Sequence, residues 1–149
     1  MSKIAVIMGS VSDKEIMKKA VDFLKDNNIQ TEVFVASAHR TPEKIQEIAK
    51  KIEADFDVVI AGAGMAAHLP GVIASLVSKP VIGVPIDASP FKGLDALLSI
   101  VQMPSGIPVA TVAVNGAKNA GILAMQILGL KDERIRACYQ TFRNSLKGE

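Results

Sequence analysis

Five short apolar runs, each followed by a loop and then a stretch with helical spacing, constrain the fold of this 149-residue chain more than any other feature. The apolar runs are rich in Val, Ile and Ala, and they predict strands at residues 3–8, 31–36, 57–61, 80–84 and 107–114. The intervening stretches predict one helix after Asp13 and further helices at residues 42–54, 66–77, 94–101 and 118–128. A last helix is predicted at residues 132–146.

This alternation predicts a single α/β domain over residues 1–149, because each crossover between parallel strands needs a helix to cover one face of the sheet. We expect three layers: a doubly wound, parallel, five-stranded sheet of flavodoxin-like order 2-1-3-4-5, with helices on both faces and an additional C-terminal helix. The composition, 49% hydrophobic but 4% aromatic, suits strands buried on both faces. Ligands of such sheets bind beyond the carboxyl ends of the strands, near the switch point between the first and third.

Charge, cysteine content and hydropathy exclude several classes of protein. The 17 Lys and Arg and 15 Asp and Glu residues give a net charge of +2 without a basic block, so no nucleic-acid partner is expected. Cys138 is the only cysteine, so no intrachain disulfide can form. Apolar runs such as 107–114 are far shorter than the roughly 20 residues of a membrane helix, and no secretory signal opens the sequence. We therefore expect a cytoplasmic protein with no membrane partner.

Three loops that follow predicted strands hold most of the small, hydroxylated and ionisable residues: 9–13 (GSVSD), 37–42 (SAHRTP) and 62–68 (GAGMAAH). The carboxyl ends of parallel strands meet at one edge, so these loops are expected to converge. Gly9 permits a tight turn, and Ser10 and Ser12 place hydroxyls beside free backbone donors, which suits a phosphate. An ordinary helix cap explains Ser10 and Asp13 equally well.

Charged residues in these loops favour an anionic nucleotide as ligand. The guanidinium of Arg40 can hold a phosphate through two parallel hydrogen bonds, the alternative being a solvent-exposed surface arginine. The carboxylate of Asp13 can accept hydrogen bonds from ribose hydroxyls, or it can cap the first helix.

The two histidines of the chain, His39 and His68, both lie in these loops. Imidazole acts as a general acid or base near neutral pH, and for His39 this role is favoured over capping of the loop. For His68, orienting the substrate or supporting the pocket explains the position as well as catalysis does. No cysteine or carboxylate pattern accompanies the histidines, so no metal is predicted.

A possible dinucleotide-binding motif and the single cysteine are weaker indications of function. Residues 62–67 (GAGMAA) match a dinucleotide-binding fingerprint with Ala at the third glycine, but they follow the third strand rather than the first. The only acid near the expected offset, Asp87, lies in an irregular loop. A nicotinamide cofactor is therefore not predicted, and Cys138 is interpreted as a packed thiol rather than a nucleophile.

Eight motifs in order resemble the bacterial-type (class I) N5-carboxyaminoimidazole ribonucleotide mutase family. They are 8–13 (MGSVSD), 37–42 (SAHRTP), 61–71 (AGAGMAAHLPG), 83–85 (GVP), 93–95 (GLD), 99–104 (SIVQMP), 106–111 (GIPVAT) and 119–120 (NA). The resemblance extends from about residue 4 to residue 128. It implies a homo-octamer of flavodoxin-like subunits with active sites at subunit contacts, no cofactor, and a phosphorylated imidazole nucleotide of purine (IMP) biosynthesis as substrate.

The same resemblance implies roles for individual residues. Ser10, Ser12 and Arg40 would bind the phosphate, and Asp13 would bind the ribose. The imidazole and carboxylate pocket would be lined by Ser37, Ala38, Ala67, His68 and Leu69, with Gly9 and Gly64 completing the substrate-binding set. His39 would carry the proton, and His68 is the second residue assigned to catalysis.

The implied reaction is an isomerisation, in which a carbamate loses carbon dioxide inside a closed pocket and a ring carbon then takes it up. Two alternatives stay open: direct carboxylation of aminoimidazole ribonucleotide, and a non-catalytic flavodoxin-like module that only binds a nucleotide. The direct carboxylases of animals tend to carry Lys at the position of Arg40 and lack the segment 66–71 (AAHLPG), which favours the mutase. Two residues depart from the family pattern, Lys14 where Trp is usual and Met65 where Gly is usual.

Overall fold

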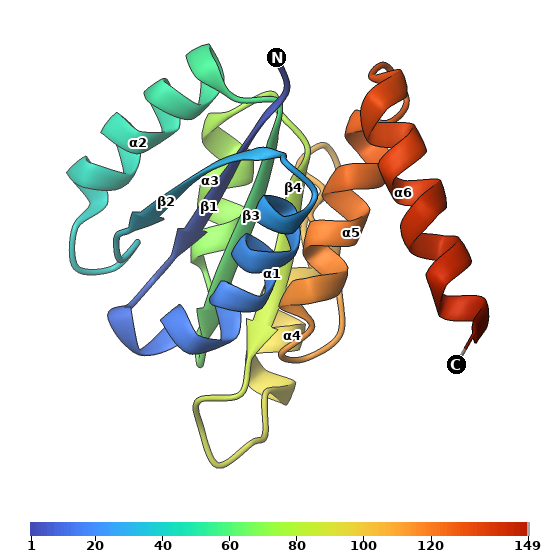
Figure 1. Ribbon diagram of the computed structural model, residues 1–149. Helices are drawn as coiled ribbons and strands as arrows, with labels where there is room; N and C mark the ends of the chain where they lie inside the picture. Colours follow the sequence, from blue (N-terminus) through green and yellow to red (C-terminus); the bar gives the residue numbers. More distant parts are fainter. Residues whose placement is uncertain (149) are drawn as a thin grey trace.

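The computed structural model describes residues 1–148, in which a five-stranded parallel sheet lies between two layers of helices (Figure 1). The strands are β1 (Lys3–Met8), β2 (Gln30–Val35), β3 (Val58–Gly64), β4 (Val81–Ile86) and β5 (Ala110–Thr111). Their order is β2-β1-β3-β4-β5, and every neighbouring pair is parallel. The predicted doubly wound sheet and its flavodoxin-like order are confirmed.

Helices cover both faces of the sheet (Figure 1). One face is covered by α1 (Lys14–Asp26) and α5 (Ala117–Leu128), and the other by α2 (Pro42–Asp55), α3 (Leu69–Leu76) and α4 (Leu94–Val101). The C-terminal helix α6 (Glu133–Ser145) packs on the outside of α5. Short 3₁₀ turns at Val11–Asp13 and Leu146–Gly148 precede α1 and follow α6.

Strand β1 shows why the sheet needs helices on both sides. Ile4, Val6 and Met8 face the core beneath α1 and α5, whereas Ala5 and Ile7 face the core beneath α2, α3 and α4. All five side chains are at most 1% exposed. An apolar strand without polar alternation is stable only when both of its faces are covered.

The third strand and helix differ from the sequence prediction, which placed residues 62–64 in a loop and began the helix at residue 66. Gly62 and Gly64 instead pair with Val84 and Ile86 of β4, so β3 continues to Gly64. A side chain at Gly62 would collide with the Met17 sulfur, and therefore only glycine allows α1 to pack this closely on β3. Residues 65–68 then form tight turns, which delay the start of α3 to Leu69.

The fifth strand is much shorter than the predicted run of residues 107–114. Only Ala110 and Thr111 pair, opposite Ile82 and Gly83 of β4. β5 lies at the edge of the sheet, and Pro108 lacks the N–H that a longer ladder requires. The apolar residues of this segment therefore serve packing rather than strand pairing, with Val109 buried in the core beneath α4.

Candidate active site

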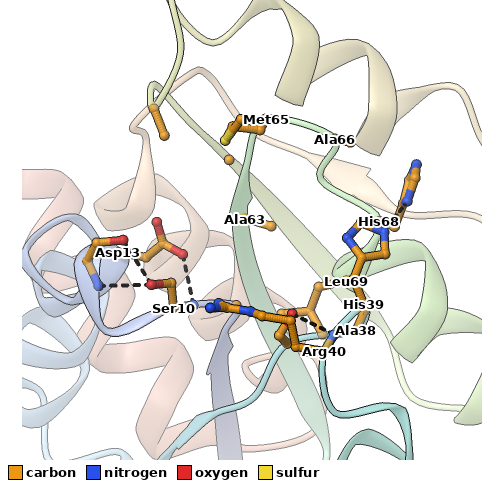
Figure 2. Close-up of a pocket in the computed structure, with 15 residues that line it drawn as sticks. Ser10, Asp13, Ala38, His39, Arg40, Ala63, Met65, Ala66, His68 and Leu69 are labelled. Carbon is orange, nitrogen blue, oxygen red and sulfur yellow. Dashed lines mark hydrogen bonds between the residues drawn. The ribbon is translucent and has the colours of Figure 1, made fainter.

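A cavity of about 500 Å³ lies beyond the carboxyl ends of β1 and β3, at the switch point of the sheet (Figure 2). The three loops singled out in the sequence meet there. The cavity is lined by Gly9, Ser10, Ser12, Asp13, Ser37, Ala38, His39, Arg40, Ala63, Gly64, Met65, Ala66, His68, Leu69 and Ala88. Eleven of the twelve residues proposed from the sequence are in this lining, and Ala67 is not.

The loop after β1 is held by hydrogen bonds between its own residues. The Asp13 carboxylate accepts from the backbone N–H of Ser10 at 3.2 Å, and the Ser10 hydroxyl accepts from the N–H of Ser12 at 3.3 Å. The hydroxyls of Ser10 and Ser12 lie 3.0 Å apart. This is the capping box of the 3₁₀ turn Val11–Asp13, whereas the Asp13 side chain makes no capping bond to α1 itself. Both Ser10 and Asp13 also line the cavity.

Asp13 is the one buried charged side chain among residues 1–148, with 6% of its surface exposed. Burial raises the pKa of its carboxyl above the usual value, and the hydrogen bond from Ser10 partly opposes this shift. The Asp13 carboxyl group is therefore already oriented by burial and by the Ser10 N–H before any ligand binds.

The loop after β2 is stabilised by hydrogen bonds between its own residues. The Ser37 hydroxyl accepts from the N–H of Arg40 at 3.2 Å, and the Thr41 hydroxyl donates to the Ser37 carbonyl at 3.0 Å. The Arg40 side chain extends along the cavity toward Ser10 (Figure 2). Within the described residues, Arg40 takes part in none of the salt bridges, so its guanidinium is available to an anionic ligand.

A shallower hollow adjoins the cavity on the other side of Arg40. It shares Gly9, Ser10, Ser37 and Arg40 with the cavity and adds Lys44, whose ammonium donates to the Val35 carbonyl at 2.9 Å. A second cation therefore lines a hollow that also includes Ser10.

The two histidines are in direct contact. Nε2 of His39 lies 2.6 Å from Nδ1 of His68, and the rings meet edge to face with centroids 4.8 Å apart. One of these nitrogens must carry a hydrogen and the other must accept it. His68 precedes α3 without making a side-chain capping bond, so capping does not explain its position. The remaining nitrogens, Nδ1 of His39 and Nε2 of His68, are left for other partners.

The loop after β3 holds one proposed site residue outside the lining, Ala67, and several lining residues that were not proposed. Ala67 is only 1% exposed and packs in the core beneath α2 and α3, because the turns at 65–68 direct its methyl group inward. The cavity is also lined by four residues that were not predicted as site residues: Ala63, Met65, Ala66 and Ala88. The first three lie within or beside the loop that was recognised, whereas Ala88 follows β4 and carries no sequence signal.

Residues 1–148 contain no group of three or more His, Cys, Asp or Glu side chains arranged to hold a metal ion. None of the helices in this part of the chain is both long and apolar enough to cross a membrane.

The fold and the cavity define a class: a flavodoxin-like α/β protein with a ligand cavity at the switch point of its sheet. Within this class, the chain belongs to the AIR carboxylase family, whose sequence profile matches residues 3–149. The family resemblance predicted from the motifs is confirmed.

Individual relatives agree with this assignment. The chain is 54% identical to the N5-carboxyaminoimidazole ribonucleotide mutase of Saccharolobus solfataricus, over 100% of this chain and 95% of that protein. It is 58% identical to the protein of the same name from Methanocaldococcus jannaschii, over 97% and 90% of the two chains. The crystal structure of Treponema denticola PurE superposes with a TM-score of 0.91 at 31% identity, covering 99% and 93% of the two chains.

Proposed function

We infer that this chain catalyses the N5-carboxyaminoimidazole ribonucleotide mutase reaction of purine biosynthesis. The product would be 4-carboxy-5-aminoimidazole ribonucleotide, an isomer in which the carboxyl group has moved from nitrogen to carbon. Relatives that carry this name match nearly the full length of the chain at 54% and 58% identity. The observation that supports the chemistry most directly is the His39–His68 contact in the wall of the cavity.

The cavity is polar at one side and carries the imidazole pair at the other, which suggests how the substrate lies (Figure 2). Ser10, Ser12 and Arg40 would bind the phosphate, with Asp13 accepting hydrogen bonds from the ribose hydroxyls. Ser37, Ala38, Gly64 and Leu69 would surround the imidazole ring, and Gly9 would let the phosphate approach the backbone closely. Ala67, which lies outside the lining, would support this wall from behind.

The reaction needs one proton to be given and one to be taken. When the carbamate C–N bond breaks, the electron pair stays on the nitrogen, which takes a proton from His39 as carbon dioxide departs. The ring carbon then attacks carbon dioxide, and His39 recovers the proton that this carbon loses, so charge and atoms balance. His68 would hold the ring of His39 in place through the 2.6 Å contact.

Holding carbon dioxide and the ring carbon in the right orientation would supply much of the rate enhancement. Carbon dioxide released beside the ring carbon reacts as though in a unimolecular step, an advantage of up to about 7–11 kcal/mol in favourable cases. No step of this scheme calls for a cofactor, because the electron-rich ring itself attacks carbon dioxide.

Supplying purified protein with the carbamate substrate tests the proposal. The carbon-linked carboxylate should form without added bicarbonate or nucleoside triphosphate. If product forms only from aminoimidazole ribonucleotide and bicarbonate, the protein is a direct carboxylase, the activity that the family description names. Ligand binding without either reaction would identify a binding module instead.

The chain offers an apolar surface that supports assembly into a homo-oligomer, with the octamer as our proposal. Leu94, Leu98 and Val101 project from one side of α4 and are 54%, 49% and 45% exposed. Phe91, in the loop before α4, is 68% exposed. An apolar row at helical spacing together with an exposed aromatic ring is typical of a surface that another subunit covers. We also propose that the chain acts as one domain in the cytoplasm, where purine nucleotides are made.

A further inference from the structure

The main chain at Met65 has an unfavourable conformation in the wall of the cavity. Its φ is +58°, in the left-handed region, and its side chain is 58% exposed. Among residues 1–148, the other non-glycine residues with positive φ are Asn28, Lys92 and Asn115. Asparagine tolerates this region, whereas an ordinary side chain costs about 1–2 kcal/mol there. Met65 is thus the only apolar side chain held in this conformation in the described chain.

Close packing and tight turns flank Met65 on its two sides. At Gly64, an added Cβ would lie 2.7 Å from the Ala88 Cβ and 3.1 Å from the Ile86 carbonyl oxygen, so a side chain does not fit at the last residue of β3. After Met65, the N–H of Ala67 donates to the Met65 carbonyl at 2.8 Å, and the N–H of His68 donates to the Ala66 carbonyl at 2.8 Å. Glycine at position 65 would make the same turn without strain.

The Met65 side chain lies where it can cover apolar space. In Figure 2, Met65 and Ala66 are at the rim of the cavity away from Ser10 and Arg40. Ala63 lies below Met65 in Figure 2, and both Ala63 and Ala88 contribute small apolar side chains to the lining. An unbranched thioether with three rotatable bonds adapts its shape to a neighbouring ligand more readily than branched side chains do.

We propose that Met65 confines the released carbon dioxide by closing the apolar rim of the cavity over it. Carbon dioxide is small, uncharged and non-polar, so no ion pair or strong hydrogen bond can retain it. Only shape and apolar contact can keep it beside the ring carbon until the new bond forms. This role rests on the proposed mutase reaction, and it accounts for an apolar side chain at a position where glycine would be less strained.

An isotope experiment tests the proposal. The carbamate substrate is labelled with ¹³C in its carboxyl group, and the reaction is run in unlabelled bicarbonate with carbonic anhydrase, so that escaped carbon dioxide is diluted at once. Mass spectrometry of the product then reports the share of carboxyl groups that stayed bound. The unmodified protein should retain nearly all of the label.

Three variants at position 65 distinguish the effect of the side chain on carbon dioxide retention from the effect of the backbone conformation. Met65→Gly and Met65→Ala both remove the thioether, and each should increase the ratio of released aminoimidazole ribonucleotide to product by about tenfold, equivalent to about 1.4 kcal/mol. Met65→Leu keeps the bulk and should retain the label. Asn28→Gly, which relieves a left-handed residue in the turn after α1, serves as the control and should change nothing.

The outcomes distinguish this proposal from the function on which it depends. If the unmodified protein makes no product from the carbamate, the mutase assignment itself fails. If it does, and Met65→Ala retains as much label as the unmodified protein, confinement by Met65 is wrong. Loss of label in Met65→Gly alone also overturns the proposal, since it would show that only the backbone conformation matters.

Discussion

Nε2 of His39 and Nδ1 of His68 lie 2.6 Å apart, although the two residues come from different loops and are 29 positions apart in the chain. His39 belongs to the loop between β2 and α2, and His68 immediately precedes α3. Because a hydrogen bond between imidazoles needs one nitrogen that carries hydrogen and one that does not, the ring states of the two residues are linked. Under the proposed function, the two rings would act together in transferring the proton.

Replacing His39 should separate binding from turnover. His39→Asn removes the acid–base group but keeps a polar side chain of similar reach, so kcat should fall by about 10²–10⁴ while product affinity changes little. Steady-state kinetics gives kcat, and calorimetric titration with the carbon-linked carboxylate gives the product affinity. Unchanged kcat would remove His39 from the chemistry.

His68 is expected to act through His39. His68→Ala should lower kcat by less than His39→Asn does, and the double variant should be scarcely worse than His39→Asn alone. Residues that act as one unit give such non-additive losses. Additive losses in kcat would show that the 2.6 Å contact has no part in turnover.

Arg40 should govern affinity rather than the chemical step. Arg40→Ala removes a charge-assisted contact worth about 1.5–3 kcal/mol, or roughly 10- to 100-fold in KM. Arg40→Lys should recover only part of the affinity lost in Arg40→Ala, since an ammonium cannot form two parallel hydrogen bonds with a phosphate. Arg134→Ala, which removes an arginine of α6 remote from the cavity, is the matched control. Equal KM values for the two alanine variants would contradict the phosphate assignment.

Asp13 gives a pH dependence of stability with a definite sign. Because burial raises the pKa of this carboxyl, the folded state binds more protons than the unfolded state between the usual pKa of about 3.9 and the raised value. The contribution of Asp13 to the free energy of unfolding therefore falls as pH rises through this window. In Asp13→Asn this dependence should disappear, so the variant gains stability relative to the unmodified protein as pH increases. Urea unfolding across pH 3.5–7 measures the difference, and a constant difference would contradict it.

Packing at Gly62 predicts that substitutions at Gly62 and Met17 have non-additive effects on stability. Gly62→Ala places a methyl group against the Met17 sulfur and should cost about 1–3 kcal/mol. Met17→Ala is destabilising by itself because Met17 is fully buried, but it also removes the collision, so the double variant should lose less stability than the sum of the two single losses. Gly148→Ala, where an added Cβ meets nothing within 4 Å, is the control. Thermal and urea unfolding give the comparison, and additive effects of the two substitutions would refute the close contact.

The exposed side of α4 provides a test of assembly. Leu98→Asp puts a charge in the middle of the apolar row and should convert an oligomer into smaller species, because a buried unpaired carboxylate is strongly unfavourable. Light scattering coupled to gel filtration measures the mass. Lys50→Asp, an exposed substitution on α2, is the control. An unchanged mass would place the subunit contacts elsewhere.

Much of the fold was predictable from local patterns. Val58–Ile60 and Ile4–Ile7 are apolar at every position, which indicates strands buried on both faces, and Pro42 marks the first turn of α2. The strand-end loops with Ser10, His39 and Arg40 could likewise be recognised, because topology alone brings the carboxyl ends of parallel strands together.

Contacts between distant segments were not predictable in this way. Local patterns were enough to predict the order of strands and helices, the loops that meet at the cavity and the family. They did not predict that β3 continues through its glycines to pair with β4, or that β5 is reduced to two paired residues. Nor did they predict that Ala67 turns inward while Ala88 joins the cavity. Only the tertiary structure decided these features, together with the His39–His68 contact and the left-handed conformation of Met65. The physical reason is that hydrophobic period and turn chemistry are local properties of the chain, whereas these features depend on which atoms of distant residues share the same space.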